Sequence, residues 1–259
     1  MTLQGALVDL DGTVYRGDQL LPGADEGIAA LRAAGIDVQF LSNNPSKRPA
    51  TYREKLRAFG IPVADDEIIT SSVVTADYLS THYPDATVLV IGEGALVDVL
   101  VEYGVHVTET PDDVDIVLAS MDLSFDFETM STALDALDED TIIAATNPDR
   151  TCPVAGGEIP DAGAVIGAIE GMTGRHPDLV FGKPSSITVD FALGRLGVEP
   201  EACLMIGDRL ETDGRMGERA KLSTAIVLTG ITGRADLIDA DPQPTYVLDS
   251  LGDVATVIE

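Results

Sequence analysis

The amino-acid sequence predicts an α/β fold: a Rossmann-like, parallel-sheet core domain with a second α/β domain inserted into it. Short apolar segments alternate with longer segments whose apolar residues recur at helical spacing, which is typical of parallel βαβ units. This alternation restarts around Thr87, and the first pattern resumes near Leu179. We therefore assign residues 1–82 and 179–259 to the core domain and residues 83–178 to the inserted domain.

Residues 1–82 are expected to form three strands, each followed by a helix. The first apolar run ends in Asp9, and Gly12 then allows a sharp turn. Pro45 stops the second strand, while Gly35 and Gly60 end the first two helices. The expected strands are residues 6–9, 36–42 and 67–70, and the expected helices are residues 22–34, 47–59 and 73–82.

The rest of the chain repeats this alternation. In the inserted domain we expect strands at residues 87–92 and 114–120, a strand and loop at 141–149, and helices at 95–103, 127–137 and 162–172. In the returning core we expect a strand and turn at residues 179–186, strands at 202–208, 223–230 and 244–250, and helices at 187–196, 212–220 and 251–258.

The charge of the chain is strongly acidic. Sixteen Lys and Arg residues face 44 Asp and Glu residues, which gives a formal net charge of −28, and only four of the cations are Lys. Such a surface repels nucleic acid, because nucleic-acid binding depends on cationic contacts to phosphate. The excess acid is explained either by solubility alone or by a cytoplasm of high salt, where screening makes self-repulsion tolerable. We favour the halophilic explanation.

Other features of the composition point to a soluble cytoplasmic protein. No apolar run approaches the ~20 residues of a membrane span, so no membrane partner is expected. The first residues contain no basic segment and only a short apolar run, unlike a signal peptide. Cys152 and Cys203 lie far apart and the chain has only three histidines, so zinc and redox chemistry have no support.

Four polar clusters follow apolar strands of the predicted core. The carboxyl ends of parallel strands meet at one edge of a sheet, so we expect these clusters to converge. They offer carboxylates, a hydroxyl, amides and one lysine, and hard oxygen ligands of this kind favour Mg²⁺. The clusters are Asp9 with Asp11, Ser42-Asn43-Asn44, Gly182-Lys183-Pro184 and Gly207-Asp208-Arg209.

This set of groups is suited to phosphoryl transfer, which needs charge neutralisation and in-line placement. An Asp carboxylate can act as the nucleophile and form an aspartyl-phosphate. A second acid can protonate the leaving oxygen and then activate water. Residues i and i+2 of an extended strand point the same way, so Asp9 and Asp11 are expected to face the same space.

The motifs resemble those of the haloacid dehalogenase superfamily. Asp9–Thr13 (DLDGT) is similar to the DxDGT signature of this superfamily. FLSNN at 40–44, GKPS at 182–185 and GDRLETD at 207–213 resemble the other three motifs of the superfamily, in the same order. TVYRG after the first motif, ATNPD at Ala145–Asp149 and VFGKPS resemble the NagD-like, p-nitrophenylphosphatase branch, which is related to phosphoglycolate phosphatase. The resemblance implies a Mg²⁺-dependent phosphatase that acts on a small phosphorylated metabolite.

The resemblance also implies a role for each motif residue. Asp9 would be the nucleophile and a Mg²⁺ ligand, and Asp11 the general acid/base with its main-chain carbonyl on the metal. Ser42, Asn43 and Asn44 would hold the phosphoryl group. Lys183 would neutralise that group and orient Asp9, Asp208 would be the acidic metal ligand, and Asp213 would support the metal site. Gly214 departs from the family pattern, in which an apolar residue commonly follows this motif.

In this branch an inserted α/β cap lies between the second and third motifs, where residues 83–178 lie here. Such a cap excludes water and selects the leaving group. The resemblance implies that Asn147-Pro148-Asp149 is a cap loop facing the substrate. Caps of this branch often contribute to dimers, so a homodimer is a further expectation. No role is assigned to Tyr15 or Arg16.

Each motif also has a purely structural interpretation. Asp-x-Asp followed by Gly can be an ordinary turn. Ser42 can end a strand, Asn43-Asn44 and Asn147-Pro148-Asp149 can be turns, and Lys183 can be a solvated lysine. Asp208 and Asp213 can be a helix cap and a first-turn acid.

Three rival functions remain beside the phosphatase. A dehalogenase would need neither a metal nor the second acid, so the presence of Asp11 and Asp208 argues against it. A phosphomutase is less consistent with the large insertion and the GKPS motif. A non-catalytic protein that binds or senses a phosphometabolite is the alternative from a different class, and ligand binding without turnover would support it.

Overall fold

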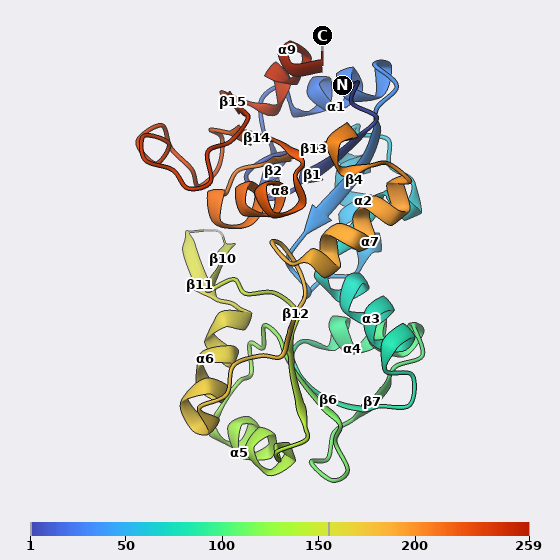
Figure 1. Ribbon diagram of the computed structural model, residues 1–259, viewed down its shortest axis with the longest axis vertical. Helices are drawn as coiled ribbons and strands as arrows, with labels where there is room; N and C mark the ends of the chain where they lie inside the picture. The colour runs from blue at the N-terminus through green and yellow to red at the C-terminus, as the bar shows by residue number, and fades with distance from the viewer. Residues whose placement is uncertain (1, 155, 259) are drawn as a thin grey trace. The chain divides into compact units, whose positions relative to one another are not determined.

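The computed structural model describes residues 2–154 and 156–258, and the chain divides into two compact units (Figure 1). Unit 1 contains residues 2–42, 49–69 and 183–258, and unit 2 contains residues 43–48 and 70–182. The helix at Ser71–His82 (α3) therefore groups with the insertion, whereas the sequence places it in the core.

Unit 1 is built on a six-stranded sheet with the order β15-β14-β13-β1-β4-β5, and the pairings from β15 to β4 are parallel. A short antiparallel hairpin of β2 and β3 follows β1. The strands are β1 (Gly5–Asp9), β2 (Tyr15–Arg16), β3 (Gln19–Leu20), β4 (Asp37–Ser42), β5 (Ile68–Thr70), β13 (Cys203–Gly207), β14 (Ser223–Val227) and β15 (Tyr246–Leu248).

Helices cover both faces of this sheet. Alternate residues of β1 point to opposite faces: Ala6 and Val8 belong to the core packed under α1 and α2, while a Cβ on Gly5 would lie 3.0 Å from Leu196 of α7. Asp9 lies four positions after Gly5 on the same strand, so its side chain points to the same face of the sheet, the one covered by α7. The helices are α1 (Ala24–Ala33), α2 (Pro49–Ala58), α7 (Ser186–Leu196), α8 (Arg215–Ala220) and α9 (Ala255–Ile258).

Unit 2 contains a parallel five-stranded sheet with the order β12-β9-β8-β6-β7. Figure 1 shows α5 and α6 together on one side of this sheet and α3 and α4 on the other. The elements are β6 (Thr87–Ile91), α4 (Gly94–Glu102), β7 (His106–Thr108), β8 (Ile116–Ala119), α5 (Phe127–Ala136), β9 (Ile142–Ala145), α6 (Ala162–Thr173), β12 (Leu179–Val180) and the antiparallel hairpin of β10 (Thr151–Val154) with β11 (Gly157–Pro160).

The strand that precedes Lys183 differs from the sequence prediction. The sequence pattern predicts a strand of the core sheet here, but β12 pairs with β9 of unit 2. Asp178, just before β12, donates its main-chain N–H to Ile143 O at 2.7 Å and accepts the Ile143 N–H at 2.9 Å, and both bonds fix this pairing. Lys183 therefore reaches unit 1 on the loop that leads into α7.

The α/β class predicted from the sequence is confirmed. Two short antiparallel hairpins, β2–β3 and β10–β11, and the strand β7 were not predicted. Among the described residues, no helix combines the length and apolar character that crossing a bilayer requires.

Candidate active site

Three neighbouring strands of unit 1 bring the predicted acids to one sheet edge. In the parallel register, Asp9 at the end of β1 lies beside Leu41 of β4, and Val8 lies beside Ile206 of β13. Ser42 and Asp208 are therefore the residues at the corresponding ends of β4 and β13. This is the edge at which open parallel sheets bind ligands.

The carboxylates of Asp9, Asp208 and Asp213 form one buried group, with a ligand oxygen from each lying within 4.8 Å of the others. Asp213 belongs to a π-helical turn (Leu210–Gly214) that precedes α8, a geometry frequent at functional sites. Its carboxylate lies over Gly207, where a Cβ would lie 2.1 Å from Asp213 Cγ. Glycine at the end of β13 thus makes room for this acid.

Lys183 joins two of these acids. Its ammonium group is buried and donates hydrogen bonds to Asp9 Oδ1 and, at 2.7 Å, to Asp213 Oδ1. Burial alone would lower the pKa of Lys183, but the charges of Asp213 and Asp9 outweigh it and raise the pKa. The lysine is therefore a permanent cation in this cluster, and a solvated surface position is excluded.

One lysine does not balance three buried carboxylates. Burial raises the pKa of Asp9 well above its usual range, with Lys183 opposing this and Asp213 adding to it. Burial, followed by repulsion from Asp213, raises the pKa of Asp208 to about 6. Buried acids in excess of their cations can hold a metal ion, and a set of carboxylate oxygens suits Mg²⁺. The donor set therefore fits the metal that the sequence predicts.

The turn after β1 holds the second acid of the first motif. Gly12 has φ +93°, a left-handed conformation that favours glycine. Thr13 Oγ1 donates to Asp9 Oδ2 at 3.2 Å, and the buried Tyr15 hydroxyl donates to Asp11 Oδ2 at 3.4 Å. Asp11 is half-buried, whereas Asp208 is buried.

Ser42 is the motif residue at the end of β4. It is buried, and its Oγ donates to the Tyr52 hydroxyl at 3.5 Å. Tyr52 lies on α2, which follows the second motif in the chain, so a side chain from α2 reaches the end of the strand that carries this hydroxyl.

Asn43 and Asn44 follow Ser42 in the chain and belong to unit 2. The Asn43 carbonyl accepts hydrogen bonds from Ser71 Oγ at 2.6 Å and Asn147 Nδ2 at 3.0 Å, and Asn43 Nδ2 donates to Asp149 Oδ2 at 3.1 Å. Asn44 Oδ1 accepts the Ser46 N–H at 2.9 Å.

The buried Asn147 holds main chain within unit 2. It is fully buried, its Nδ2 donates to the Asn43 carbonyl at 3.0 Å, and its Oδ1 accepts the Asp149 N–H at 2.8 Å. Its position on a loop facing the substrate stays a prediction.

Comparison with known proteins identifies the family. Residues 6–106 match the haloacid dehalogenase-like hydrolase family, and residues 180–254 match the HAD-hydrolase-like family. The chain is 38% identical over 255 residues to sugar-phosphatase AraL of Bacillus subtilis (strain 168), covering 98% of this chain and 93% of the relative. The chain belongs to the haloacid dehalogenase-like hydrolase family.

Solved structures of this family share the fold over almost the whole chain. The p-nitrophenyl phosphatase from Archaeoglobus fulgidus has a TM-score of 0.93 and 33% identity, with 99% of this chain and 100% of that chain covered. NagD from E. coli K-12 has a TM-score of 0.89 and 29% identity, with 98% of each chain covered. The resemblance to the NagD-like, p-nitrophenylphosphatase branch is confirmed.

A further strand end of this hydrolase also reaches the site, and sequence reasoning missed it. After β14, Thr229 Oγ1 donates to the Gly12 carbonyl at 2.6 Å, and the Ile231 N–H donates to Asp208 Oδ2 at 2.7 Å. The signal in the sequence was Thr229-Gly230 at the carboxyl end of the strand predicted over residues 223–230, at the same edge as the other motifs.

Proposed function

We propose that this hydrolase is a Mg²⁺-dependent phosphatase that cleaves a small phosphomonoester through an aspartyl-phosphate on Asp9. Membership of the family and the named phosphatases among its relatives make the chain a phosphoric monoester hydrolase. The observation that carries the finer proposal is the buried group of Asp9, Asp208 and Asp213 with Lys183 bonded to two of them.

In the first proposed step, one carboxylate oxygen of Asp9 forms a bond to phosphorus while the bond from phosphorus to the leaving oxygen breaks. Asp11 gives its proton to that oxygen, and the alcohol departs. Lys183 and Thr13 already hold the Asp9 carboxylate by one hydrogen bond on each oxygen, which supports an oriented nucleophile. We propose that Ser42 hydrogen-bonds the phosphoryl oxygens.

In the second proposed step, the Asp11 carboxylate takes a proton from water, whose oxygen bonds to phosphorus as the Asp9–phosphate bond breaks. Inorganic phosphate leaves and both acids return to their starting states. We propose that Asp9, Asp208 and the main-chain carbonyl of Asp11 hold the metal. Bound Mg²⁺ would supply positive charge to the carboxylates and the phosphoryl oxygens.

The inserted domain is proposed to be a cap that excludes water and selects the leaving group. The side chains that make this selection are not marked in the sequence. Sugar phosphates are the first class to test, because the 38% identical relative is named a sugar-phosphatase. A cytoplasmic location and a homodimer stay predictions.

The test of the proposed nucleophile is the hydrolysis of p-nitrophenyl phosphate with Mg²⁺. Asp9→Asn is expected to abolish turnover, because an amide cannot form the aspartyl-phosphate. The matched control is Asp37→Asn, which removes an exposed carboxylate at the opposite end of the neighbouring strand and should leave activity unchanged. Turnover by Asp9→Asn would refute the nucleophile, and phosphate binding by the wild type without turnover would favour the sensor function.

We also propose that the protein works in a cytoplasm of high salt. The net charge of −28 supports this, because salt screening reduces the self-repulsion of such a surface. Circular dichroism during dilution from molar KCl is expected to show loss of folded structure. A chain that stays fully folded in low salt would contradict a halophilic origin.

A further inference from the structure

The loop that follows β14 contacts two of the predicted metal-site segments at once. Thr229 Oγ1 donates to the carbonyl of Gly12, in the turn between Asp9 and Thr13, at 2.6 Å. The Ile231 N–H donates to the carboxylate of Asp208 at 2.7 Å, and the Thr232 N–H donates to the Asp208 carbonyl at 3.0 Å. Three donors of one short loop therefore bond to the first and fourth motifs.

Gly230, between these donors, has a steric role. A Cβ at this position would lie 1.8 Å from Asp208 Oδ2 and 2.3 Å from Asp208 Cγ. The backbone of Gly230 is not among those with positive φ, so the requirement is for space and not for a glycine conformation. A Cβ on Gly12 would lie 2.4 Å from the same Oδ2. The Asp208 carboxylate is thus packed directly between two glycines.

The hairpin after the first motif reinforces this loop. Arg16, on β2, donates its guanidinium N–H groups to the carbonyls of Thr229 and Gly230. The Ile231 side chain is 53% exposed, so apolar burial does not account for the path of the loop at that residue. The contacts that hold this part of the loop are instead polar bonds to Asp208, to the Gly12 turn and to Arg16.

We propose that Thr229, Gly230 and the Ile231 N–H are positioning groups that set the divalent-cation affinity by fixing the Asp208 carboxylate and the Gly12 turn. This inference rests on the proposed function. Groups that orient metal ligands in this way tune metal affinity without contacting the metal themselves.

The test measures Mg²⁺ and Mn²⁺ binding by isothermal titration calorimetry, beside the Mg²⁺ concentration that gives half-maximal activity. Gly230→Ala is expected to weaken metal binding about 10-fold or more, the range found for groups that orient metal ligands. Thr229→Val should weaken it by a smaller factor, because it removes only the bond to the Gly12 carbonyl. In both variants kcat at saturating Mg²⁺ should change far less than the metal affinity.

Two matched controls belong to the same loop. Thr229→Ser keeps the hydroxyl, and Gly233→Ala adds a methyl group whose nearest neighbour is Asp236 Oδ2 at 3.5 Å. Both should bind metal as the wild type does. Thermal unfolding in EDTA reports whether each variant folds, and Thr229→Val provides the test if Gly230→Ala does not.

Two outcomes overturn the inference. Wild-type metal affinity in folded Gly230→Ala or Thr229→Val refutes the positioning role, as does an equal fall of kcat at every Mg²⁺ concentration. If the wild type itself binds no metal and hydrolyses no phosphate ester, the proposed function fails as well. The two failures are therefore distinguishable by the wild-type titration.

Discussion

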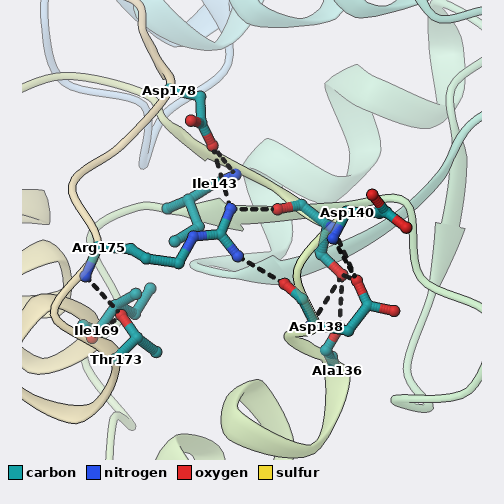
Figure 2. Close-up of polar contacts among 9 residues, drawn as sticks. Ala136, Asp138, Asp140, Ile143, Ile169, Thr173, Arg175 and Asp178 are labelled. Carbon is teal, nitrogen blue, oxygen red and sulfur yellow. Dashed lines mark hydrogen bonds and ion pairs between the residues drawn. The ribbon is translucent and has the colours of Figure 1, made fainter.

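Two polar clusters, one in each unit, pair a cation with acids and have opposite character. In unit 2, Arg175 donates to the carbonyls of Asp138 at 2.6 Å and Thr141 at 2.5 Å and lies 3.5 Å from Asp178 Oδ2 (Figure 2). Asp138 accepts further bonds from the Thr141 side chain and from the N–H groups of Thr141 and Asp140. Each of these contacts is a hydrogen bond or ion pair between groups that attract one another.

The pKa of Asp138 in unit 2 and the pKa values of Asp9 and Asp208 in unit 1 are shifted in opposite directions. Hydrogen bonding, first from the Thr141 side chain, lowers the pKa of Asp138. Burial raises the pKa of Asp9 and of Asp208. An acid that its surroundings stabilise contributes to structure, whereas buried acids in mutual repulsion cost stability and are kept where chemistry needs them. The direction of the pKa shift thus distinguishes Asp138 of the Arg175 cluster from Asp9 and Asp208 of the cluster that we propose to be reactive.

Among the substitutions that compare these two clusters, replacing Lys183 is expected to have the largest effect. We call the group of Asp9, Asp208, Asp213 and Lys183 the reactive cluster. Lys183→Met removes the cation that bonds to Asp9 and Asp213 and should lower kcat/KM for p-nitrophenyl phosphate by about 10²–10³-fold, as for other electrostatic stabilisers. Steady-state kinetics at saturating Mg²⁺ measures this. Arg175→Met is the matched control, because it removes the cation of the unit 2 cluster and should keep near wild-type kcat/KM. An equal loss of kcat/KM in both variants would show that the two clusters do not differ in their effect on catalysis.

The second effect concerns stability in unit 2. Arg175→Met removes the donor to the carbonyls of Asp138 and Thr141 and should destabilise the protein by about 0.5–1.5 kcal/mol for each hydrogen bond lost, the net contribution of a typical one. Chemical denaturation at a salt concentration that keeps the wild type folded measures it. Arg234→Met is the control, since Arg234 pairs with the carboxylate of the exposed Asp249 on the other unit, and such surface pairs contribute little. A stability equal to the wild type would show that the Arg175 contacts are not structural.

The residues that sequence reasoning placed correctly are those with a local signal. Asp9, Ser42 and Asp208 follow apolar runs whose burial makes them strands, so their meeting at one edge follows from parallel pairing. The partnership of Lys183 with Asp213 needed the structure, because the two lie 30 positions apart in the chain.

What sequence reasoning missed depends on the main chain and on distant pairing. The Ile231 N–H bonds to Asp208 through an atom that every residue except proline carries, so the side chain gives no signal. Likewise, β12 pairs with β9 in the sheet of unit 2, and Asp178 just before it forms hydrogen bonds to Ile143. The apolar residues of β12 alone would fit either sheet. The buried role of Asn147 depends on the Asn43 carbonyl, which no local pattern indicates.

The smallest expected effect is a gain of stability in the reactive cluster. Burial raises the pKa of Asp208 from its ordinary 3.8 to about 6, so the metal-free folded protein binds more protons than the unfolded chain between these values. Stability from this residue is therefore full below pH about 4 and is lost as pH rises through about 6. Asp208→Asn removes that loss and should stabilise the metal-free protein at neutral pH, with no gain at pH about 4. Thermal unfolding in EDTA at both pH values measures the difference from the wild type, and Mg²⁺ should stabilise only the wild type.

A variant less stable than the wild type at neutral pH would mean that the Ile231 N–H bond outweighs repulsion, and Asp208 would then resemble the acids around Arg175.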